Sequence, residues 1–261
     1  MCYNDEAGSR NYQSTAFIYN IGREVTDMGF GSENKNKAIT FSYDDGVTQD
    51  IRLINLLDKY GLKCTFNLNS ALLGKKGILQ NRDQKISHYK IHPDDVRRVY
   101  EGHEIAVHTL THPNLTQCDD GEVIRQVEED RLRLSELAGY EVVGMAYPCG
   151  GVNNDDRVAR LIKENTGVKY SRTIKSNNSF EPQNNLFRFD PTVYHLNFED
   201  MMRLGQEFVE LQTDEPRIFY VWGHSYEMDL GADLWIRLEE FFKLIGNRDD
   251  IFYGTNKEIL I

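Results

Sequence analysis

Strand-like and helix-like segments alternate along most of this chain, and no other feature narrows its possible folds as much. Short runs of β-branched and aromatic residues are separated by stretches whose apolar residues have helical spacing. Such repeats place their strands parallel in one sheet, and roughly seven or eight of them suit a closed barrel. The sequence therefore predicts an α/β barrel. The expected strands are 37–43, 63–69, 104–108, 141–147, 168–173, 186–189, 217–222 and 251–253, and the expected helices are 48–60, 92–102, 119–137, 154–165, 198–212 and 232–245.

The chain is expected to form one domain, preceded by an extension. Residues 1–36 are polar and weakly periodic, which predicts an extension packed on the outside of the domain, with a short strand at 16–19. Residues 37–261 contain no Pro/Ser-rich linker, so they are assigned to a single catalytic domain. Within it, the glycine- and lysine-containing stretch 70–91 is predicted to be a long loop on the functional side.

Charge and composition exclude several classes of partner. The net charge is -11 and there is no sustained basic run, which argues against binding to nucleic acid or to an anionic membrane surface. No stretch approaches the ~20 apolar residues that span a bilayer, and the acidic N-terminus does not resemble a signal peptide. The four cysteines match no zinc or CxxC pattern and are too few for a disulfide scaffold, so we expect reduced thiols and a cytoplasmic protein; they are Cys2, Cys64, Cys118 and Cys149.

Two adjacent carboxylates, Asp44 and Asp45, follow the strand at 37–43 directly, and Gly46 lets the backbone turn there. Like charges this close raise one another's pKa, and a bound cation would remove that cost. One carboxylate would then hold the cation while the other handles a proton. The alternative is an exposed Asp-Asp-Gly turn, which is common.

Two histidines four residues apart, His108 and His112, follow another strand. They share a face if the segment makes one helical turn, and they lie at the end of the strand where barrel enzymes carry their catalytic groups. With Asp45 they would supply three ligands and leave an open position, as in a catalytic metal site. One carboxylate and two imidazoles suit Zn, Co, Mn or Ni, with Zn expected. The alternative is a pair of surface histidines.

Two more stretches carry candidate groups. His224 follows the strand at 217–222, and Trp222 is placed to flank a sugar or another flat ligand, although a histidine in such a position is more often a core residue. At 146–151 a strand stops at Pro148 and two glycines free the backbone, a bend that can point an N–H into a site or simply make a turn. The remaining histidines are expected to be structural; they are His88, His92, His103 and His195.

Taken in order, these stretches resemble the NodB-homology polysaccharide deacetylases, carbohydrate esterase family 4, over roughly 37–255. Asp44-Asp45 is similar to the family's TFDDG motif, with Ser42-Tyr43 replacing the usual neighbours, and residues 108–112 match its H-S/T-x-x-H motif. Residues 222–224 are similar to its late L-x-H motif. Its R-x-P-Y motif aligns with 146–149, where Ala146 replaces the arginine that orients the catalytic aspartate in the family.

The resemblance implies a distorted (β/α)7 barrel and a set of residue roles. Asp44 would be the general base, His224 the general acid, and Asp45, His108 and His112 the ligands of one divalent metal. Substrate or oxyanion contacts would come from Cys149, through its N–H, and from Tyr147, Trp222 and Thr109. Asp190 is the candidate for the aspartate that tunes the late histidine.

The predicted function is a metal-dependent hydrolase that removes N-acetyl groups from an amino-sugar oligo- or polysaccharide, such as a chitooligosaccharide or a peptidoglycan-like chain. One alternative is hydrolysis of a non-sugar amide or an O-acetyl sugar on the same barrel. Another is a non-catalytic carbohydrate-binding protein, which the missing arginine favours and the retained Asp44 disfavours.

Overall fold

The computed structural model describes residues 29–81 and 84–261, so most of the predicted extension, with its strand at 16–19, lies outside the described residues. The strands are β1 (Lys37–Asp44), β2 (Cys64–Leu68), β3 (Lys76–Asn81), β4 (Gln84–Tyr89), β5 (Glu104–Val107), β6 (Gly144–Ala146), β7 (Tyr170–Arg172), β8 (Val193–Tyr194), β9 (Arg217–Gly223) and β10 (Ile251–Tyr253). The α-helices are α1 (Asp50–Lys59), α2 (Val96–Val99), α3 (Asp120–Ala138), α4 (Asp156–Asn165), α5 (Phe198–Glu210), α6 (Leu234–Ile245) and α7 (Asn256–Leu260). Within these ranges, none of the helices has both the length and the apolar character of a membrane span.

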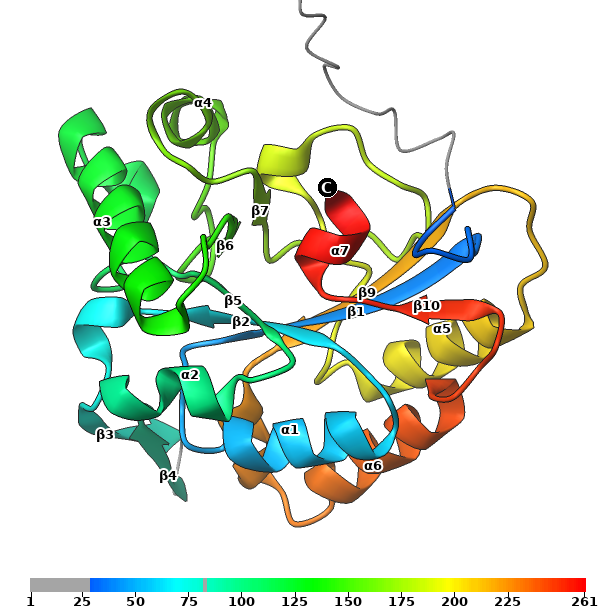
Figure 1. The fold of residues 1–261 in the computed structure, drawn as a ribbon. Coiled ribbons are helices and arrows are strands. Elements are labelled where there is room, and N and C mark those ends of the chain that lie inside the picture. The colour runs from blue at the N-terminus through cyan, green and yellow to red at the C-terminus, as the bar shows by residue number, and fades with distance from the viewer. Residues whose placement is uncertain (1–28, 82–83) are drawn as a thin grey trace, which may run out of the picture.

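The main sheet is parallel and curls into a distorted barrel, as predicted (Figure 1). Its order is β7-β6-β5-β2-β1-β9-β8, and β10 pairs with the start of β1. The stretch 189–194 reaches both edges of this sheet. Phe189 bridges to Arg172 at the end of β7, and β8 pairs with β9, so this stretch closes the ring. Helices α1 to α6 pack around the outside of the sheet (Figure 1).

Strand β1 is buried along its whole length, and its two faces differ in character. Ile39, Phe41 and Tyr43 belong to the large apolar cluster between sheet and helices, where the Phe41 ring meets the edges of two phenylalanine rings of α6. The alternate residues, Ser42 and Asp44 among them, face the barrel interior, because successive side chains of a strand point to opposite faces. The interior therefore carries polar groups that the outer layer excludes.

The short helix α7 packs against the barrel interior. Ile259 and Leu260 are buried in one apolar cluster with Tyr170 and Tyr220. The carboxylate of Glu104 accepts hydrogen bonds from the backbone N–H of Lys257 (2.9 Å), from Thr65 Oγ1 (2.8 Å) and from the Tyr170 hydroxyl (2.7 Å). This buried carboxylate thus ties the first turn of α7 to β2 and β7.

Several predicted elements were wrong. The stretch 70–91 is not a long loop: it contains the antiparallel hairpin of β3 and β4. Residues 186–188 form a 3-10 turn, not a strand, and only Phe189 makes a bridge. Strands β6 and β7 are shorter than expected, and the sequence analysis identified neither β8 nor α7.

Candidate active site

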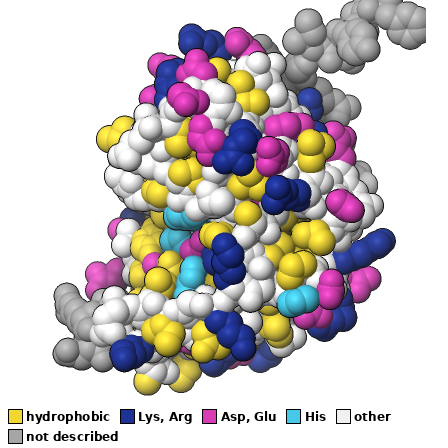
Figure 2. Space-filling model, turned by 90° about the vertical axis from the view of Figure 1, so that its left-hand side faces the viewer, with side chains coloured by type: hydrophobic (Ala, Val, Ile, Leu, Met, Phe, Trp, Pro, Cys, Tyr) yellow, Lys and Arg dark blue, Asp and Glu magenta, His cyan; other side chains and the backbone are white. Residues whose placement is uncertain are grey.

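The carboxyl ends of β1, β5 and β9 and the turn after β6 surround one pocket of about 230 Å³. Figure 2 views this end of the barrel and shows histidine side chains in a hollow among hydrophobic ones. A larger hollow of about 560 Å³, lined by Arg97, His103 and Tyr140 among others, contains none of the candidate residues. The residues that line the smaller pocket are Asp44, Asp45, His108, His112, Tyr147, Cys149, Gly150, Ile174, Trp222, His224 and Tyr226.

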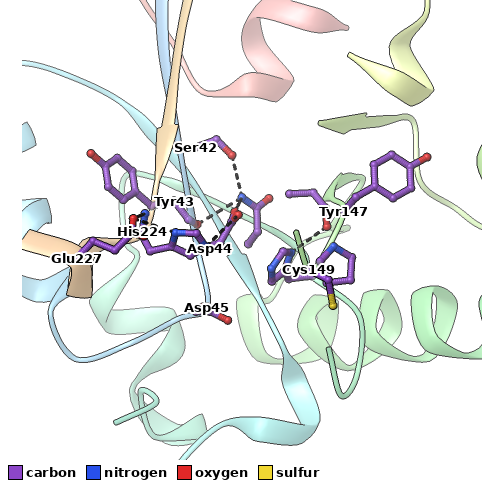
Figure 3. Close-up of polar contacts among 12 residues, drawn as sticks. Ser42, Tyr43, Asp44, Asp45, Tyr147, Cys149, His224 and Glu227 are labelled. Atoms are coloured by element: carbon purple, nitrogen blue, oxygen red, sulfur yellow. Dashed lines mark hydrogen bonds and ion pairs between the residues drawn. The ribbon is translucent and has the colours of Figure 1, made fainter. Parts of the chain in front are cut away.

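Asp44 is 2% exposed and is held by donors from two other strands. Nη2 of Arg172 lies 2.5 Å from both carboxylate oxygens, and Nδ2 of Asn67 donates to Oδ1 at 2.8 Å. Burial would raise the pKa of Asp44, but Arg172, His108 and His224 outweigh it and hold the pKa below its usual range. Asp44 is therefore an ionised carboxylate fixed in one orientation, and Figure 3 shows it between Ser42 and His224.

Asp45, His108 and His112 come together as a three-donor cluster. One ligand atom from each lies within 4.8 Å of the others. Nδ1 of His108 donates to the carbonyl of Ala146 at 2.9 Å. The lone pair of Nε2 is therefore available to coordinate a metal ion. Burial lowers the pKa of His108 to about 4, so the ring is neutral at pH 7, the form that ligates metals. These donors fit a divalent transition metal.

Asp45 also contacts two residues of the hairpin region that the sequence analysis did not assign to the site. Lys90 Nζ donates to the Asp45 carbonyl (2.6 Å) and to Oδ1 (3.1 Å), and Nε2 of His88 lies 3.4 Å from Oδ2. The prediction that His88 is only structural was wrong in this respect. The Asp45 pKa is well below its usual range, because these partners outweigh its burial. The hairpin region thus supports Asp45 from outside the pocket lining.

His224 pairs with Glu227 three residues later. Nδ1 of His224 lies 3.0 Å from Oε2 of Glu227, and Nε2 lies 3.9 Å from Oδ2 of Asp44. Burial would lower the pKa of His224, but Glu227 and then Asp44 raise it to about 9. The imidazole is therefore protonated at pH 7. Glu227 is also shared with His195 (2.7 Å) and the Tyr194 hydroxyl, so His195 belongs to the site as well.

Four site residues adopt left-handed backbone torsions. These are Asp45 (φ 84°), Thr109 (φ 68°), His112 (φ 64°) and Cys149 (φ 69°), and in the described chain the other non-glycine residues with positive φ are all asparagines. Asparagine tolerates this region, whereas other side chains are strained in it. At Asp45 the torsion breaks the alternation of the strand, so that two consecutive carboxylates serve the same pocket.

Some of the predicted contacts are placed differently. Thr109 is fully buried, and its Oγ1 accepts from the His112 N–H (3.1 Å), so it supports the histidine turn instead of lining the pocket. The Tyr147 hydroxyl donates to the Phe187 carbonyl (2.7 Å) and its ring points away from Asp44 and His224 (Figure 3), so Tyr147 borders the pocket without turning its hydroxyl toward these two residues. The assignment of Asp190 was wrong: it accepts from Thr173 Oγ1, and Glu227 occupies the place beside His224.

Cys149 and Trp222 line the pocket as predicted. The amide of Asn153 holds the turn at Cys149 by donating to its carbonyl at 2.8 Å, and the Cys149 N–H has no acceptor among the described residues. Sγ of Cys149 lies 3.7 Å from Nδ1 of His112. The indole N–H of Trp222 is buried without a partner in the described chain, although it borders the pocket.

Curated relatives include the chitooligosaccharide deacetylase of Rhizobium leguminosarum bv. trifolii, which is 36% identical over 102 residues, 38% of this chain and 39% of that protein. The peptidoglycan-N-acetylglucosamine deacetylase PgdA of Listeria monocytogenes is 26% identical over 121 residues, 45% of this chain and 22% of that protein. The chain thus matches less than half the length of these relatives.

Solved structures share the fold. The family 4 carbohydrate esterase from Streptomyces lividans superposes with a TM-score of 0.53 at 15% identity, covering 84% of this chain and 93% of that one. The peptidoglycan deacetylase PdaC from Bacillus subtilis gives a TM-score of 0.51 at 19% identity, covering 88% and 92%. The sequence profile of the polysaccharide deacetylases matches residues 31–171, more than half of the chain, and this chain belongs to the polysaccharide deacetylase family.

Proposed function

We propose that this protein hydrolyses the N-acetyl group of an acetylated amino sugar within an oligo- or polysaccharide. The observation that carries the proposal is the pairing of Asp44 and His224, whose facing atoms lie 3.9 Å apart in the pocket that the three-donor cluster also lines. Amide hydrolysis needs a base that takes a proton from water and an acid that gives one to the leaving nitrogen. An ionised carboxylate and a protonated imidazole in one pocket suit those two tasks.

Asp45, His108 and His112 would hold one divalent ion, with Zn the expected metal and Co, Mn or Ni the other candidates. When bound, such an ion polarises the acetamide carbonyl and lowers the pKa of a water molecule. The two imidazole donors favour these transition metals over Mg or Ca, which prefer oxygen ligands.

The side chains would divide the remaining work. Asp44 accepts the proton of the attacking water, and the Cys149 N–H donates to the oxygen that becomes negative. Nε2–H of His224 then protonates the departing amine, while Nδ1 stays paired with Glu227. General acid–base steps of this kind contribute ~10²–10⁴-fold each.

Three observations support a carbohydrate as substrate. The matched relatives are named as deacetylases of chitooligosaccharide and peptidoglycan. Trp222 and Tyr226 border the pocket and flank the His224 ring, with ring centroids 5.8 and 5.2 Å away, and such flat apolar faces pack against sugar rings. A second hollow of about 360 Å³ shares Ile174 with the pocket, and most of its other lining side chains are polar; they include Asn153, Asn154, Thr173, Lys175, Asn185, Arg188 and Asp190.

The non-catalytic alternative loses its main support. It was motivated by Ala146, which stands where the family motif has the arginine that orients the base. Arg172 contacts both oxygens of Asp44 from β7, so this base has a guanidinium partner.

Acetate release from N-acetylated chitooligosaccharides, with zinc or cobalt added, tests the proposal. An O-acetylated sugar and a small non-sugar amide serve as comparison substrates. Faster release from the N-acetylated sugar supports the proposal. Metal binding without acetate release from any acetylated sugar would return the protein to the carbohydrate-binding class.

The two aspartates should separate under mutation. Asp44→Asn is expected to abolish turnover and to keep the metal, because Asp44 pairs with Arg172 and lies outside the three-donor cluster. Asp45→Asn, the matched control, should lose metal along with activity. Acetate release and elemental analysis of both purified variants check this, and loss of metal from Asp44→Asn would contradict the division of roles.

A further inference from the structure

Among the side chains of the described residues that are almost fully buried, Arg172 is the largest by volume. A buried guanidinium is costly unless its donors are paired. Here Nη2 is paired with both oxygens of Asp44, Nε donates to Ser42 Oγ at 3.1 Å, and Nη1 donates to the Thr173 carbonyl at 3.0 Å. Trp222 covers the guanidinium, with its ring centroid 4.6 Å from Cζ. The side chains that contact Arg172 are those of Asp44 and Ser42 on β1 and of Trp222 on β9.

The strand register explains how this arginine comes to replace one that the motif lacks. Ala146 of β6 and Arg172 of β7 are direct partners on neighbouring parallel strands. Partnered residues of parallel strands point to the same face of a sheet. Met145 packs in the outer apolar layer, so Ala146 and Arg172 both face the barrel interior. In the family motif an arginine stands at the position of Ala146. The small side chain of Ala146 leaves room in the barrel interior beside Arg172.

We propose that Arg172 is the positioning residue of the base Asp44, and that it supplies from β7 the guanidinium which the family's R-x-P-Y motif supplies from the position of Ala146. This inference rests on the proposed function for its catalytic part. The small residue on β6 and the large one on β7 form one complementary pair, since two guanidinium groups would compete for one carboxylate. The orientation of Asp44 therefore depends on a residue outside all four motif stretches.

A swap of the two residues tests this assignment. Arg172→Ala should lower kcat by ~10²-fold, the scale of a lost general base contribution. It should leave KM nearly unchanged, because Arg172 is not among the residues that line the pocket. It should also lower Tm, because Asp44 is left buried without its partner. The double variant Ala146→Arg/Arg172→Ala restores the arrangement of the motif and should recover both Tm and most of kcat. Ala146→Arg alone should lower Tm without raising kcat.

Two controls separate positioning from general stability. Arg131 is another mostly buried arginine, paired with Glu128 at 2.6 Å on α3, and Arg131→Ala should lower Tm with kcat unchanged. Arg172→Lys keeps the charge but loses the planar fork, so its kcat should fall between those of wild type and Arg172→Ala. Should Arg172→Ala fail to fold, the Lys variant and the double variant still decide the question.

The outcomes are distinct. A folded Arg172→Ala variant with wild-type kcat overturns the inference, as does a double variant that recovers neither kcat nor Tm. If the wild-type protein releases no acetate from any substrate, the proposed function fails by itself. The pairing with Asp44 is then still read from Tm: recovery in the double variant supports the exchange between strands, and no recovery overturns it.

Discussion

At the scale of single residues, the site gives two neighbouring carboxylates opposite surroundings. Asp44 faces a guanidinium and an amide inside the barrel, whereas Asp45 faces two imidazoles and the ammonium of Lys90 near the pocket. Both stay ionised, because each has its own positive partners. The left-handed torsion of Asp45 keeps both carboxylates at one pocket, because it breaks the alternation that would send the second one to the opposite face of the sheet.

Glu227 should set the upper pH limit of activity. It is the main group that raises the pKa of His224 to about 9 against the effect of burial. A general acid must be protonated, so kcat should fall as the pH rises through about 9. Glu227→Gln removes the carboxylate, lowers the pKa of His224 and should move this alkaline limb to lower pH. Measurement of kcat from pH 6 to 10 checks the shift.

The same pKa has a consequence for stability. The folded-state pKa of His224 lies above the unfolded value of ~6.5. The charge of its imidazole therefore stabilises the fold fully below pH ~6.5, and this contribution is lost as the pH rises through about 9.

The matched control for Glu227→Gln is Asp229→Asn, because Asp229 follows in the same turn but accepts hydrogen bonds from Gln49 and Trp235. An alkaline limb that moves equally in both variants would contradict a specific role for Glu227.

Sequence patterns located the residues that lie next to one another in a motif and missed two of their partners, Arg172 on another strand and Glu227 in the turn after His224. Asp44, Asp45, His108, His112 and His224 all line the pocket. Arg172 carried only a weak signal: an arginine at an interior-facing position of a predicted strand. Glu227 carried a clearer one, since a carboxylate three residues after His224 fits the capping-box spacing at the start of a turn.

At the scale of elements, helices with strong apolar periodicity were predicted to within about two residues. The third helix was expected at 119–137 and spans Asp120–Ala138, with Asp119 capping its start and Gly139 ending it in a left-handed conformation. The hairpin of β3 and β4 escaped prediction because it covers no core. Only Ile86 of β4 is buried, and Ile78 of β3 is 62% exposed, so no alternation marks the strands. Its role in the site comes from the residues at its end, His88 and Lys90.

The helix α7 should owe its place to one buried carboxylate. Glu104→Ala removes the acceptor of three hydrogen bonds and leaves the Tyr170 hydroxyl and the Lys257 N–H without it. Each buried donor left unpaired costs about 1–3 kcal/mol, so the urea midpoint should fall clearly. Acetate release at low denaturant should persist, because Glu104 lies in none of the pocket walls. Glu101→Ala, at an exposed position nearby, should leave the midpoint unchanged, and equal midpoints for both variants would contradict the role of Glu104.

At the scale of the whole molecule, the three-donor cluster joins segments far apart in the sequence. Asp45 follows β1, and His108 and His112 follow β5, so a bound ion links two strands that are separated in the sheet by β2. A ligand that binds only the folded state stabilises it by about 2.7 kcal/mol at a hundredfold excess over its Kd. For a domain of this size that corresponds to a rise in Tm of roughly 5–10 °C.

Added zinc should therefore raise the Tm of the wild-type protein, and EDTA should reverse the rise. His108→Ala should abolish it, because one of three donors is lost. His92→Ala, which removes an exposed histidine away from the pocket, should keep the full rise. Calorimetry of the three proteins with and without zinc checks this, and an equal rise in His108→Ala would place the metal elsewhere.

The architecture was more predictable from sequence than the details of its closure. Alternating strands and helices indicated the parallel barrel, because the connections leave few other arrangements. The closing stretch 189–194 was not recognised, since it consists of a single bridge at Phe189 and the two residues of β8, with no long apolar run. The predicted cytoplasmic location stays a prediction; among the described cysteines, Cys64, Cys118 and Cys149 are free.

The left-handed torsions at the pocket have a consequence for the history of such a chain. Glycine would relax the backbone at Asp45, Thr109, His112 and Cys149, and at the first and third it would also remove side chains that only a working site needs. Stability alone thus pulls these positions toward glycine, while catalysis pulls against it. Where selection for turnover has lapsed, glycine is therefore expected to appear at these four positions.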